Sequence, residues 1–493
     1  MYIELDGQGP RYAQLIRALK TLILDGRLPA GSRLPASRTL AREIEVSRNT
    51  VLAAYEQLQA EGFLLGKVGS GSYVADVGSR TNPARRPAPA LLAAPLSPFA
   101  RRALAITDGS RIPGRQHAGL RYNLQYGVPL TNPALASAWR REVNRAAERA
   151  GFDYPDAQGL PALRERICDY LSRRRGVDAV PEDVLVVSGT QQAFALAARV
   201  LLEDGAAVAL EDPHYRGARQ IFAAHGARVR GVRVDDEGLV PAALPARARL
   251  AVVTPSHQFP TGALLPLARR MELLQWAGSS QAWLIEDDYD GEFRYGGRPL
   301  AALKSLDRDG RVIYIGSFSK TLFPALRLGY MVLPAALREA FRAAKWLEDR
   351  GSNTLEQVAL AQFMGSGGFE RHLRRAAQTL RARRSAMLAG LDRHAGGAFD
   401  IVDSNAGMHL AAWLRSRSHA DCERLAAHAR ARGLGLYTVA PYALSAALRP
   451  GLLLGYAALP PADIEAAMRL LGRCLLEHAP HGLISVRAGG VLS

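Results

Sequence analysis

Residues 34–63 read LPASRTLAREIEVSRNTVLAAYEQLQAEGF and decide the fold of the first part of the chain. The pattern predicts two helices joined by a tight turn, because each apolar run at helical spacing follows a serine that can cap it. Ser37 is the predicted cap of the first helix, whose apolar positions are Leu40, Ala41 and Ile44. Ser47 is the predicted cap of the second, which Gly62 ends and whose inward positions are Val51, Tyr55 and Leu58.

The sequence on either side of this stretch completes a small domain. An earlier helix is predicted from an apolar stripe made of Tyr12, Leu15, Ile16, Leu19, Leu22 and Ile23, with Asp25-Gly26 at its end. Residues 63–75, FLLGKVGSGSYVA, predict two short strands around a Gly-Ser-Gly tip. Residues 1–75 are therefore predicted to form an N-terminal winged helix-turn-helix, an α+β fold.

This order of elements predicts DNA binding. The last helix presents Arg48, Asn49 and Thr50 at its N-terminal end, where a recognition helix enters the major groove. Arg38 opens the preceding helix, where a positive side chain and free backbone N–H groups suit a phosphate. Gly71 in the tip of the hairpin lets the backbone come close to the minor groove. Each residue alone is explained as well by a cap or a solvated charge, and only the ordered set indicates DNA.

The same segment resembles the GntR family of bacterial transcriptional regulators. The resemblance rests on L-P-x-S-R-x-L-A, V-S-R-x-T-V, the following A-Y and the G-x-G of the hairpin, all within residues 34–74. It implies that this domain binds double-stranded promoter DNA. By motif position, the implied DNA contacts are Arg38, Arg48, Asn49, Thr50 and Gly71.

Charge is distributed unevenly along the 493 residues. The chain has 63 Lys and Arg against 46 Asp and Glu, a formal net charge of +17, and a basic chain suggests a polyanionic partner. Residues 1–75 carry only +2 of this excess, whereas residues 76–118 carry +5. The latter segment is rich in Pro, Ala and Arg without a helical or strand period, so it is predicted to be a linker. Its arginines either keep the chain soluble or contact DNA phosphates.

Several classes of protein are excluded by composition. Three distant cysteines, Cys168, Cys422 and Cys474, permit neither a disulfide framework nor a C-x-x-C metal pair, which favours a reducing cytoplasm. The first residues lack a signal-peptide pattern. No run of roughly 18 apolar residues occurs, so no membrane span is expected. No metal site is predicted.

Residues 119–493 are predicted to form a large α/β domain. Short apolar strands alternate with amphipathic helices, which indicates a largely parallel sheet, and ligands of such sheets bind beyond the carboxyl ends of the strands. Polar residues gather there. Gly189, Thr190 and Gln191 lie between a strand and a helix, Asp287 and Tyr289 follow the strand AWLIE, and Lys320 follows the strand RVIYIG. Taken singly, each has an ordinary structural explanation: residues 189–191 as a helix cap, Asp287 as a turn former and Lys320 as a solvated lysine.

Together these residues describe a site for an aldehyde cofactor with a phosphate arm. Lys320 provides the amine for a Schiff base, and Asp287 the carboxylate that keeps a pyridine nitrogen protonated. The phosphate is expected at residues 189–191, where the helix begins, helped by Ser317, Ser319 and Arg327. Tyr215 is expected to stack on the ring, and Tyr289 to hydrogen-bond its hydroxyl oxygen.

This domain resembles the fold-type-I aminotransferases that depend on pyridoxal 5′-phosphate, over roughly residues 120–475. The motifs are YPDAQGLPALR, SGTQQA, SHQFPTG, EDDYDGEF and SFSK followed by RLGY. Joined to a GntR head, it resembles the MocR/PdxR subfamily of regulators. That resemblance implies a cytoplasmic transcription factor that responds to pyridoxal phosphate or to its adduct with an amino compound, and that controls vitamin B6 or amino-compound metabolism. It also implies a homodimer, with the head of one chain near the body of the other.

Two departures from the aminotransferases bear on activity. Phe259 stands where an asparagine usually touches the ring hydroxyl, and the strand GLLLGYAAL lacks the arginine that clamps a substrate carboxylate. Leu453 matches that position and Arg449 lies out of register, but the register is open. Weak or absent transamination is therefore expected.

Two alternatives to a cofactor-sensing regulator remain. One is a working aminotransferase that carries a DNA-binding domain, and the other is a DNA-binding protein whose body only dimerises. An arginine-rich helix in the body is predicted to be a solvated, salt-bridged face or a surface that touches DNA; its arginines are Arg371, Arg374, Arg375, Arg381, Arg383 and Arg384.

Overall fold

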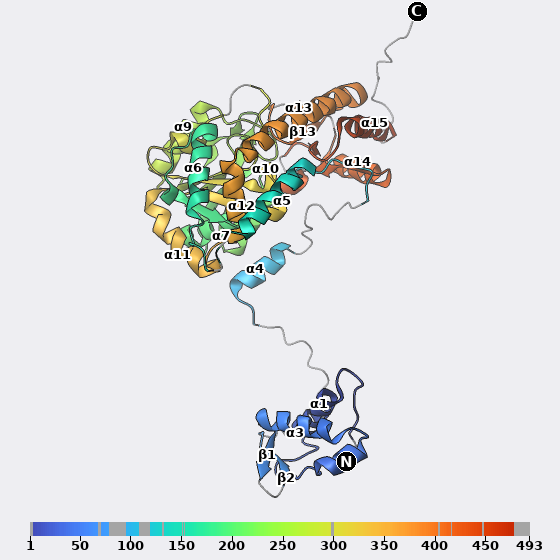
Figure 1. Ribbon diagram of the computed structural model, residues 1–493. Helices are drawn as coiled ribbons and strands as arrows, with labels where there is room; N and C mark the ends of the chain where they lie inside the picture. The colour runs from blue at the N-terminus through green and yellow to red at the C-terminus, as the bar shows by residue number, and fades with distance from the viewer. Residues whose placement is uncertain are drawn as a thin grey trace, which may run out of the picture. The chain divides into compact units, whose positions relative to one another are not determined.

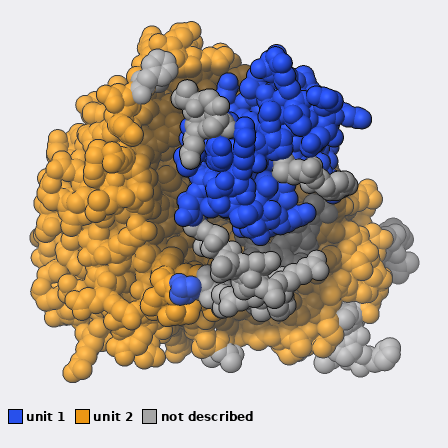
Figure 2. Space-filling model, turned by 90° about the horizontal axis from the view of Figure 1, so that it is seen from below, with its two compact units in different colours: residues 1–95 blue, residues 96–493 orange. Residues whose placement is uncertain are grey.

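The computed structural model describes residues 3–67, 71–77, 95–107, 119–130, 133–149, 151, 153–296, 300–402, 405–415, 417–445 and 448–477. The chain divides into two compact units, residues 1–95 and 96–493 (Figure 2). The first unit contains the elements α1 (Arg11–Leu24), α2 (Ser37–Glu43), α3 (Arg48–Ala60), β1 (Leu64–Lys67) and β2 (Gly71–Val74) (Figure 1).

The first unit is the predicted winged helix-turn-helix. Leu15 and Leu19 of α1 pack with Val51 and Leu58 of α3 in one apolar core, and all four are fully buried. Strands β1 and β2 pair antiparallel as the wing. Two details of the prediction were wrong. Tyr12 is 46% exposed rather than inward-facing, because it lies at the start of α1, before the stripe reaches the core.

The cap of α2 is the second wrong detail. Ala36 occupies the N-cap position, and Ser37 is already the first helical residue and makes no capping hydrogen bond. The helix therefore begins one residue earlier than the serine rule suggests. Ser47 does cap α3, since its Oγ accepts a hydrogen bond from the Thr50 N–H at 3.1 Å.

Most of the predicted linker, residues 78–94 and 108–118, lies outside the described residues. The part between them forms a helix, α4 (Pro98–Thr107), where no period had been predicted. The helix lies against α8 (Arg216–Ala224) of the body: Arg102 Nε donates to the Ala224 carbonyl at 3.0 Å, and the Phe99 ring meets that of His225 at 4.9 Å. Contacts with the body therefore stabilise a helix that the sequence pattern of this segment does not predict.

The second unit is the predicted α/β domain. Its remaining helices are α5 (Pro133–Ala147), α6 (Pro161–Arg175), α7 (Thr190–Leu201), α9 (Leu267–Ser279), α10 (Phe318–Thr321), α11 (Arg338–Asp349), α12 (Thr354–Gly365), α13 (Gly368–Ala395), α14 (His419–Ala431) and α15 (Pro461–Glu477). Its strands are β3 (Tyr122–Asn123), β4 (Val184–Val187), β5 (Ala207–Asp212), β6 (Arg228–Asp235), β7 (Gly238–Leu239), β8 (Leu250–Val253), β9 (Trp283–Asp288), β10 (Val312–Ser317), β11 (Gly329–Val332), β12 (Phe399–Val402), β13 (His409–Leu414), β14 (Leu434–Gly435), β15 (Tyr437–Thr438) and β16 (Gly451–Gly455).

The main sheet has the strand order β4-β11-β10-β9-β8-β5-β6-β7. The run β10-β9-β8-β5-β6 is parallel, whereas β11 is antiparallel to both neighbours and β7 to β6. Helices cover both faces: Val187 of β4 packs with α7, and Val186 packs in the cluster that includes α6. Burial on both faces explains why the strands are continuous apolar runs. The carboxyl ends of β4, β5, β8, β9 and β10 lie at one edge.

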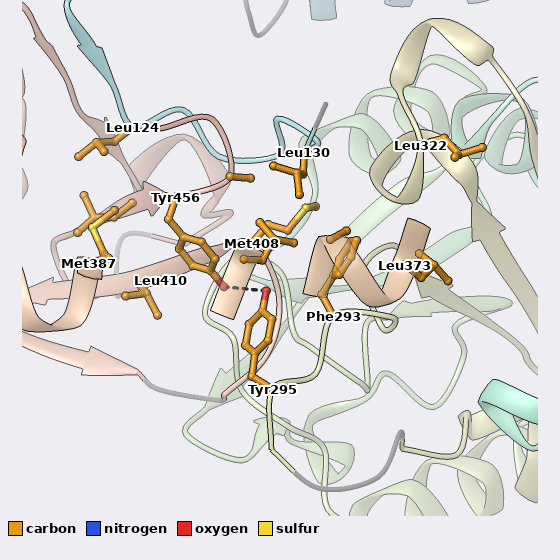
Figure 3. Close-up of a cluster of buried hydrophobic side chains, with 14 of the residues drawn as sticks. Leu124, Leu130, Phe293, Tyr295, Leu322, Leu373, Met387, Met408, Leu410 and Tyr456 are labelled. Atoms are coloured by element: carbon orange, nitrogen blue, oxygen red, sulfur yellow. Dashed lines mark hydrogen bonds between the residues drawn. The ribbon is translucent and has the colours of Figure 1, made fainter. Parts of the chain in front are cut away.

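A second, four-stranded sheet has the order β12-β13-β16-β15. It is joined to the main sheet by a cluster of apolar side chains that includes Met408, Leu410, Phe293 and Met387 (Figure 3). Two buried tyrosines lie within it, and Tyr456 OH hydrogen-bonds the carbonyl of Gly407 at 2.6 Å. This cluster fixes Met408 and β13 beside the carboxyl edge of the main sheet. Among the described residues, no helix has the length and apolarity to cross a membrane.

Candidate functional site

A pocket of about 570 Å³ lies at the carboxyl edge of the main sheet. Its lining contains every residue predicted to bind the cofactor except Gly189, namely Thr190, Gln191, Tyr215, Asp287, Tyr289, Ser317, Ser319, Lys320 and Arg327. All of these side chains except that of Arg327, which lies just before β11, come from the carboxyl ends of β4, β5, β9 and β10 or directly follow them. Parallel strands that end at one edge thus bring together residues that lie far apart in sequence.

Lys320 lies in the short helix α10, directly after β10. Its Nζ donates a hydrogen bond to the carbonyl of Gly127, at 2.5 Å. Burial lowers the pKa of this amine, and the carboxylates of Asp290 and Asp287 partly offset the effect. A lowered pKa increases the share of uncharged amine, which is the form that attacks a carbonyl carbon.

Asp287 lies on β9 beside β10 and is 6% exposed. Burial, together with the neighbouring carboxylates Asp288, Glu211 and Asp290, raises its pKa to about 7 against the opposing effect of Lys320. No described residue donates a hydrogen bond to this carboxyl group. A carboxyl group buried without a donor fits a ligand that brings its own N–H, such as a protonated ring nitrogen.

The start of α7 forms one wall of the pocket. Gly189 is its N-cap with φ +87°, and a Cβ there would lie 3.2 Å from the guanidinium of Arg327. Thr190 and Gln191 are the first residues of the helix, so their N–H groups have no partner within it. Ser317 Oγ accepts from the Ser319 N–H at 3.1 Å, which leaves the Ser317 O–H as a donor. Helix N–H groups, a hydroxyl and a guanidinium are an anion-binding set.

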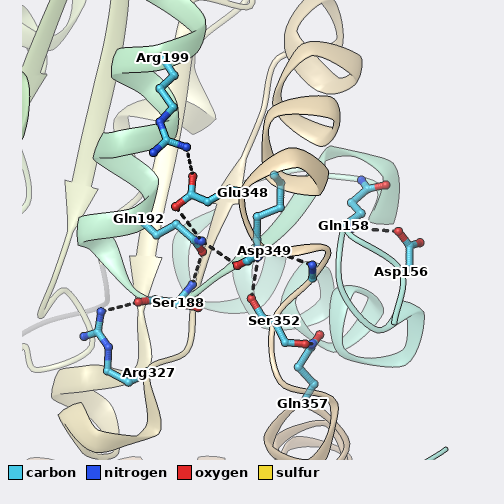
Figure 4. Close-up of polar contacts among 12 residues, drawn as sticks. Asp156, Gln158, Ser188, Gln192, Arg199, Arg327, Glu348, Asp349, Ser352 and Gln357 are labelled. Atoms are coloured by element: carbon cyan, nitrogen blue, oxygen red, sulfur yellow. Dashed lines mark hydrogen bonds and ion pairs between the residues drawn. The ribbon is translucent and has the colours of Figure 1, made fainter. Parts of the chain in front are cut away.

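A network of hydrogen bonds behind the pocket holds this wall in place (Figure 4). Arg327 Nη2 donates to the carbonyl of Ser188, whose N–H donates to Gln192 Oε1 at 2.7 Å. Gln192 Nε2 in turn donates to Asp349 Oδ2 at 2.8 Å. Asp349 pairs with the fully buried Lys345 at 2.6 Å. The turn between β4 and α7 is therefore tied to α11.

Two tyrosines predicted to contact the cofactor ring line the pocket and already have partners. Tyr215 OH accepts a hydrogen bond from Gln191 Nε2 at 2.9 Å. Tyr289 OH lies 2.9 Å from His257 Nδ1, which also lies 3.0 Å from Asp290 Oδ2. Their contacts to a ring stay predictions.

Sequence reasoning missed three buried polar residues beside the pocket, His257, Asp290 and His409. Asp290 and His409 line it, and burial lowers the pKa of His409 to about 4, so its imidazole is neutral near pH 7. Reasoning also missed the segment Gln125–Pro129, which follows the linker and β3 and forms part of the wall. His257 lies in the motif HQFPTG and Asp290 in the motif EDDYDGEF. His409 lies far from both in sequence, and only the fold brings it to the same pocket.

The second sheet shows where the two C-terminal candidates, Leu453 and Arg449, lie. Leu453 lies in β16 opposite Ala411 and Tyr437, and is fully buried in an apolar cluster with Phe259. Arg449 lies outside the pocket lining, pairs with Asp400 at 2.5 Å and lies over the Trp413 ring. Arg449 therefore does not supply a cation to the pocket.

The residues predicted to contact DNA belong to α2, α3 and the wing of the head. Arg38, Arg48 and Asn49 are exposed in the first turns of α2 and α3. The Thr50 hydroxyl lies 2.8 Å from Ser47 Oγ, within the cap of α3. Gly71 begins β2 with φ +107°, and a Cβ there would lie 3.3 Å from the side chain of Arg33. Arg33 is exposed beside the wing and is a further candidate that sequence reasoning missed.

The arginine-rich helix of the body, α13, is only partly solvated. Arg371, Arg374 and Arg375 are exposed. Arg384 is 7% exposed and lies over the Tyr295 ring, and Arg381 and Arg383 donate to the carbonyls of Tyr295 and Ala457. The prediction of a solvated, salt-bridged face was wrong for Arg384, which is buried, and for Arg383, which is half-buried, because their part of α13 packs on the body; Arg381 is exposed.

Comparison with known proteins assigns both units. Residues 122–471 match the family Aminotransferase class I and II, and residues 11–74 match Bacterial regulatory proteins, gntR family. The chain is 35% identical, over 97% of its length and 96% of the relative's, to the probable rhizopine catabolism regulatory protein MocR of Rhizobium meliloti. It is 33% identical to the HTH-type pyridoxine biosynthesis transcriptional regulator PdxR of Corynebacterium glutamicum, over 76% of this chain and 77% of that protein.

The body is also similar to a solved structure. It is the α-aminoadipate aminotransferase LysN of Thermus thermophilus, complexed with N-(5′-phosphopyridoxyl)-L-leucine, with a TM-score of 0.68 at 30% identity over 78% of this chain and 97% of that chain. The body and the head thus each match a family, and the full-length relatives carry both in one chain. The chain belongs to the aminotransferase class I and II family, in the subfamily of MocR-type, gntR-headed transcriptional regulators.

Proposed function

We propose that this protein binds promoter DNA through its head and holds pyridoxal 5′-phosphate in the pocket of its body, so that the cofactor or an amino compound bound to it changes DNA affinity. The observation that carries the proposal is the gathering of Lys320, Asp287 and an anion-binding set around one pocket of about 570 Å³. The relatives support it, since one is named a regulator of pyridoxine biosynthesis and one solved neighbour holds a phosphopyridoxyl group.

Each group of residues has a role in this proposal. When bound, pyridoxal phosphate supplies an aldehyde carbon that condenses with primary amines. Lys320 is the amine of this chain that bonds to it, and Asp287 holds the proton of the ring nitrogen. Thr190, Gln191 and the set Ser317, Ser319 and Arg327 hold the phosphate. Tyr215 covers the ring, and Tyr289 reaches its hydroxyl oxygen.

The route from pocket to head starts at the bond between Lys320 and Gly127. Gly127 belongs to the segment Gln125–Pro129, and the linker leads into this segment through residues 119–124. When Lys320 Nζ bonds to the cofactor, the Gly127 carbonyl loses its hydrogen-bond donor. The cofactor-free and cofactor-bound states therefore differ in their contacts at the segment into which the linker leads. A difference in contacts between states is what a ligand needs to shift an equilibrium. A homodimer with the head of one chain near the body of the other is part of the proposal.

The test uses the purified full-length protein. Adding pyridoxal phosphate should produce a visible absorption band that is lost in Lys320→Ala and retained in Lys304→Ala, a lysine bonded to Asp307 outside the pocket. Gel shifts on the protein's own upstream DNA should then change with pyridoxal phosphate in the wild type and not in Lys320→Ala. An unchanged absorption band in Lys320→Ala rejects the cofactor assignment. If DNA binding by the wild type does not change with pyridoxal phosphate, the body serves only as a dimerisation scaffold.

A second candidate is a working aminotransferase that carries a DNA-binding domain. It is favoured by the likeness to LysN together with the retention of Lys320 and Asp287 in one pocket. A half-reaction with common amino acids separates the two, because an enzyme converts its bound cofactor to the pyridoxamine form rapidly and in every molecule. Little or no conversion favours the regulator.

A further inference from the structure

The pocket lining falls into two chemically different groups of side chains. One group is the anion-binding set around Arg327 and the start of α7. The other is aromatic: Tyr126 and Phe259 line the pocket with their ring centroids 5.8 Å apart, and Tyr442, outside the lining, packs edge to face within 5.6 Å of both. Tyr215 lies between the groups, hydrogen-bonded to Gln191 on one side and edge to face with Phe259 at 6.1 Å on the other.

The aromatic group is backed by apolar side chains. Phe259, Tyr442 and Leu453 belong to one buried cluster that also contains Ala411, Trp413 and Val439. The Tyr126 and Tyr442 hydroxyls are hydrogen-bonded to each other, which ties the two rings together. The wall is therefore preformed, and it favours an apolar or aromatic arm over a charged one.

The charged groups of the pocket point to the same kind of ligand. Among its described lining residues, the cationic side chains are Lys320 and Arg327. Arg327 belongs to the set that would hold the cofactor phosphate, and Lys320 would be bonded to the aldehyde carbon until the effector amine replaces it there. His409 is neutral near pH 7, as its lowered pKa shows. Asp290 adds a carboxylate to the lining, 3.0 Å from His257. A ligand carboxylate would thus meet an aromatic wall and another carboxylate, without the cation that usually binds it.

We infer that the effector is a primary amine with an apolar or aromatic arm and without a carboxylate, in place of an amino acid. The inference rests on the proposed function, because the amine acts on a cofactor held at Lys320. It adds the chemical class of the effector and the wall that selects it, made of Tyr126 and Phe259 with Tyr442 packed against them.

Matched pairs of ligands test the inference on the full-length protein loaded with pyridoxal phosphate. The pairs are phenethylamine with L-phenylalanine and tyramine with L-tyrosine, which differ by the carboxylate alone. Calorimetry and the shift of the visible band should give half-saturation at a concentration at least tenfold lower for each amine. The amines, and not the amino acids at the same concentration, should alter the gel shift. Equal affinity, tighter binding of the amino acids, or no response to either overturns the inference.

A variant of the wall gives a second, independent readout. Phe259→Leu keeps the wall apolar but removes the ring, so it should reduce the preference for phenethylamine over ethylamine by about threefold or more. Phe323→Leu is the matched control, because Phe323 packs on Trp139 and does not line the pocket. An equal effect of both variants, or of neither, contradicts the role given to Phe259.

The two levels of the proposal fail in distinguishable ways. If no visible band forms with pyridoxal phosphate, the proposed function fails before an amine is added. If the band forms, depends on Lys320 and responds equally to amines and amino acids, the cofactor assignment stands and the inference about the effector is wrong.

Discussion

At the scale of single residues, Asp287 carries the clearest dependence on pH. Without cofactor its pKa is about 7, above its usual 3.8, because burial and nearby carboxylates disfavour the charge. A raised pKa means that the folded state holds its proton longer than the unfolded state does. Stability from this group is therefore complete below about pH 4 and is lost as the pH rises to about 7.

Asp287→Asn should remove this loss. In the cofactor-free protein it should raise the melting temperature at pH 7.5, with at most a few kcal/mol gained, and leave it unchanged at pH 4. In the loaded protein the sign should reverse, because asparagine cannot balance a protonated ring nitrogen. Scanning calorimetry at the two pH values, with and without pyridoxal phosphate, measures both. A variant less stable than the wild type at pH 7.5 without cofactor would contradict the assigned pKa.

Arg48 is the residue of the head from which we expect the largest effect on DNA. Arg48→Ala should weaken binding to promoter DNA by about 1–3 kcal/mol, because it removes a contact at the entry of α3 into the groove. Lys20→Ala is the control: it removes the same charge, but Lys20 pairs with Glu61 at the far end of α3. Fluorescence anisotropy at fixed salt should show at most about a twofold loss for Lys20→Ala, within the range of an exposed ion pair.

At the scale of elements, the two serines of the head give opposite expectations. Ser47 caps α3 through the Thr50 N–H, whereas Ser37 makes no capping bond. Loss of a cap costs about 1 kcal/mol, so Ser47→Ala should speed hydrogen exchange of the α3 amides about fivefold in the full-length protein. Ser37→Ala should leave the α2 amides within twofold of the wild type. Comparable changes in the two helices would mean that Ser37 caps after all.

The elements that the sequence predicted well are those with a strong local signal. The buried strands β4, β9 and β10 are apolar runs bounded by polar residues, so their carboxyl ends, and with them Asp287 and Lys320, could be located. The misses depend on packing. Helix α4 needs α8 to form its contacts, and the His409 ring meets those of His257 and Phe259 only because β13 is brought against the main sheet. No local period contains that information.

At the scale of the whole molecule, the excess charge and the DNA-reading surface are separate. The head carries +2 of the net +17, so its specificity rests on a few placed side chains, and +5 lies in residues 76–118. Arg80, Arg85 and Arg86 belong to that segment and lie outside the described residues. If they contact phosphates, they act on affinity for any DNA and leave sequence preference alone.

The salt dependence of DNA affinity tests whether Arg80, Arg85 and Arg86 contact phosphates. Replacing Arg80, Arg85 and Arg86 by alanine in the full chain should reduce the slope of log K against log salt by up to about 2.7, since each phosphate contact contributes about 0.9. Alanine at Arg371, Arg374 and Arg375, exposed on α13 of the body, removes the same charge and serves as control. A lower slope for the first variant alone assigns DNA contact to the linker. Equal slopes for both variants and the wild type would show that neither set of three arginines contacts DNA phosphates.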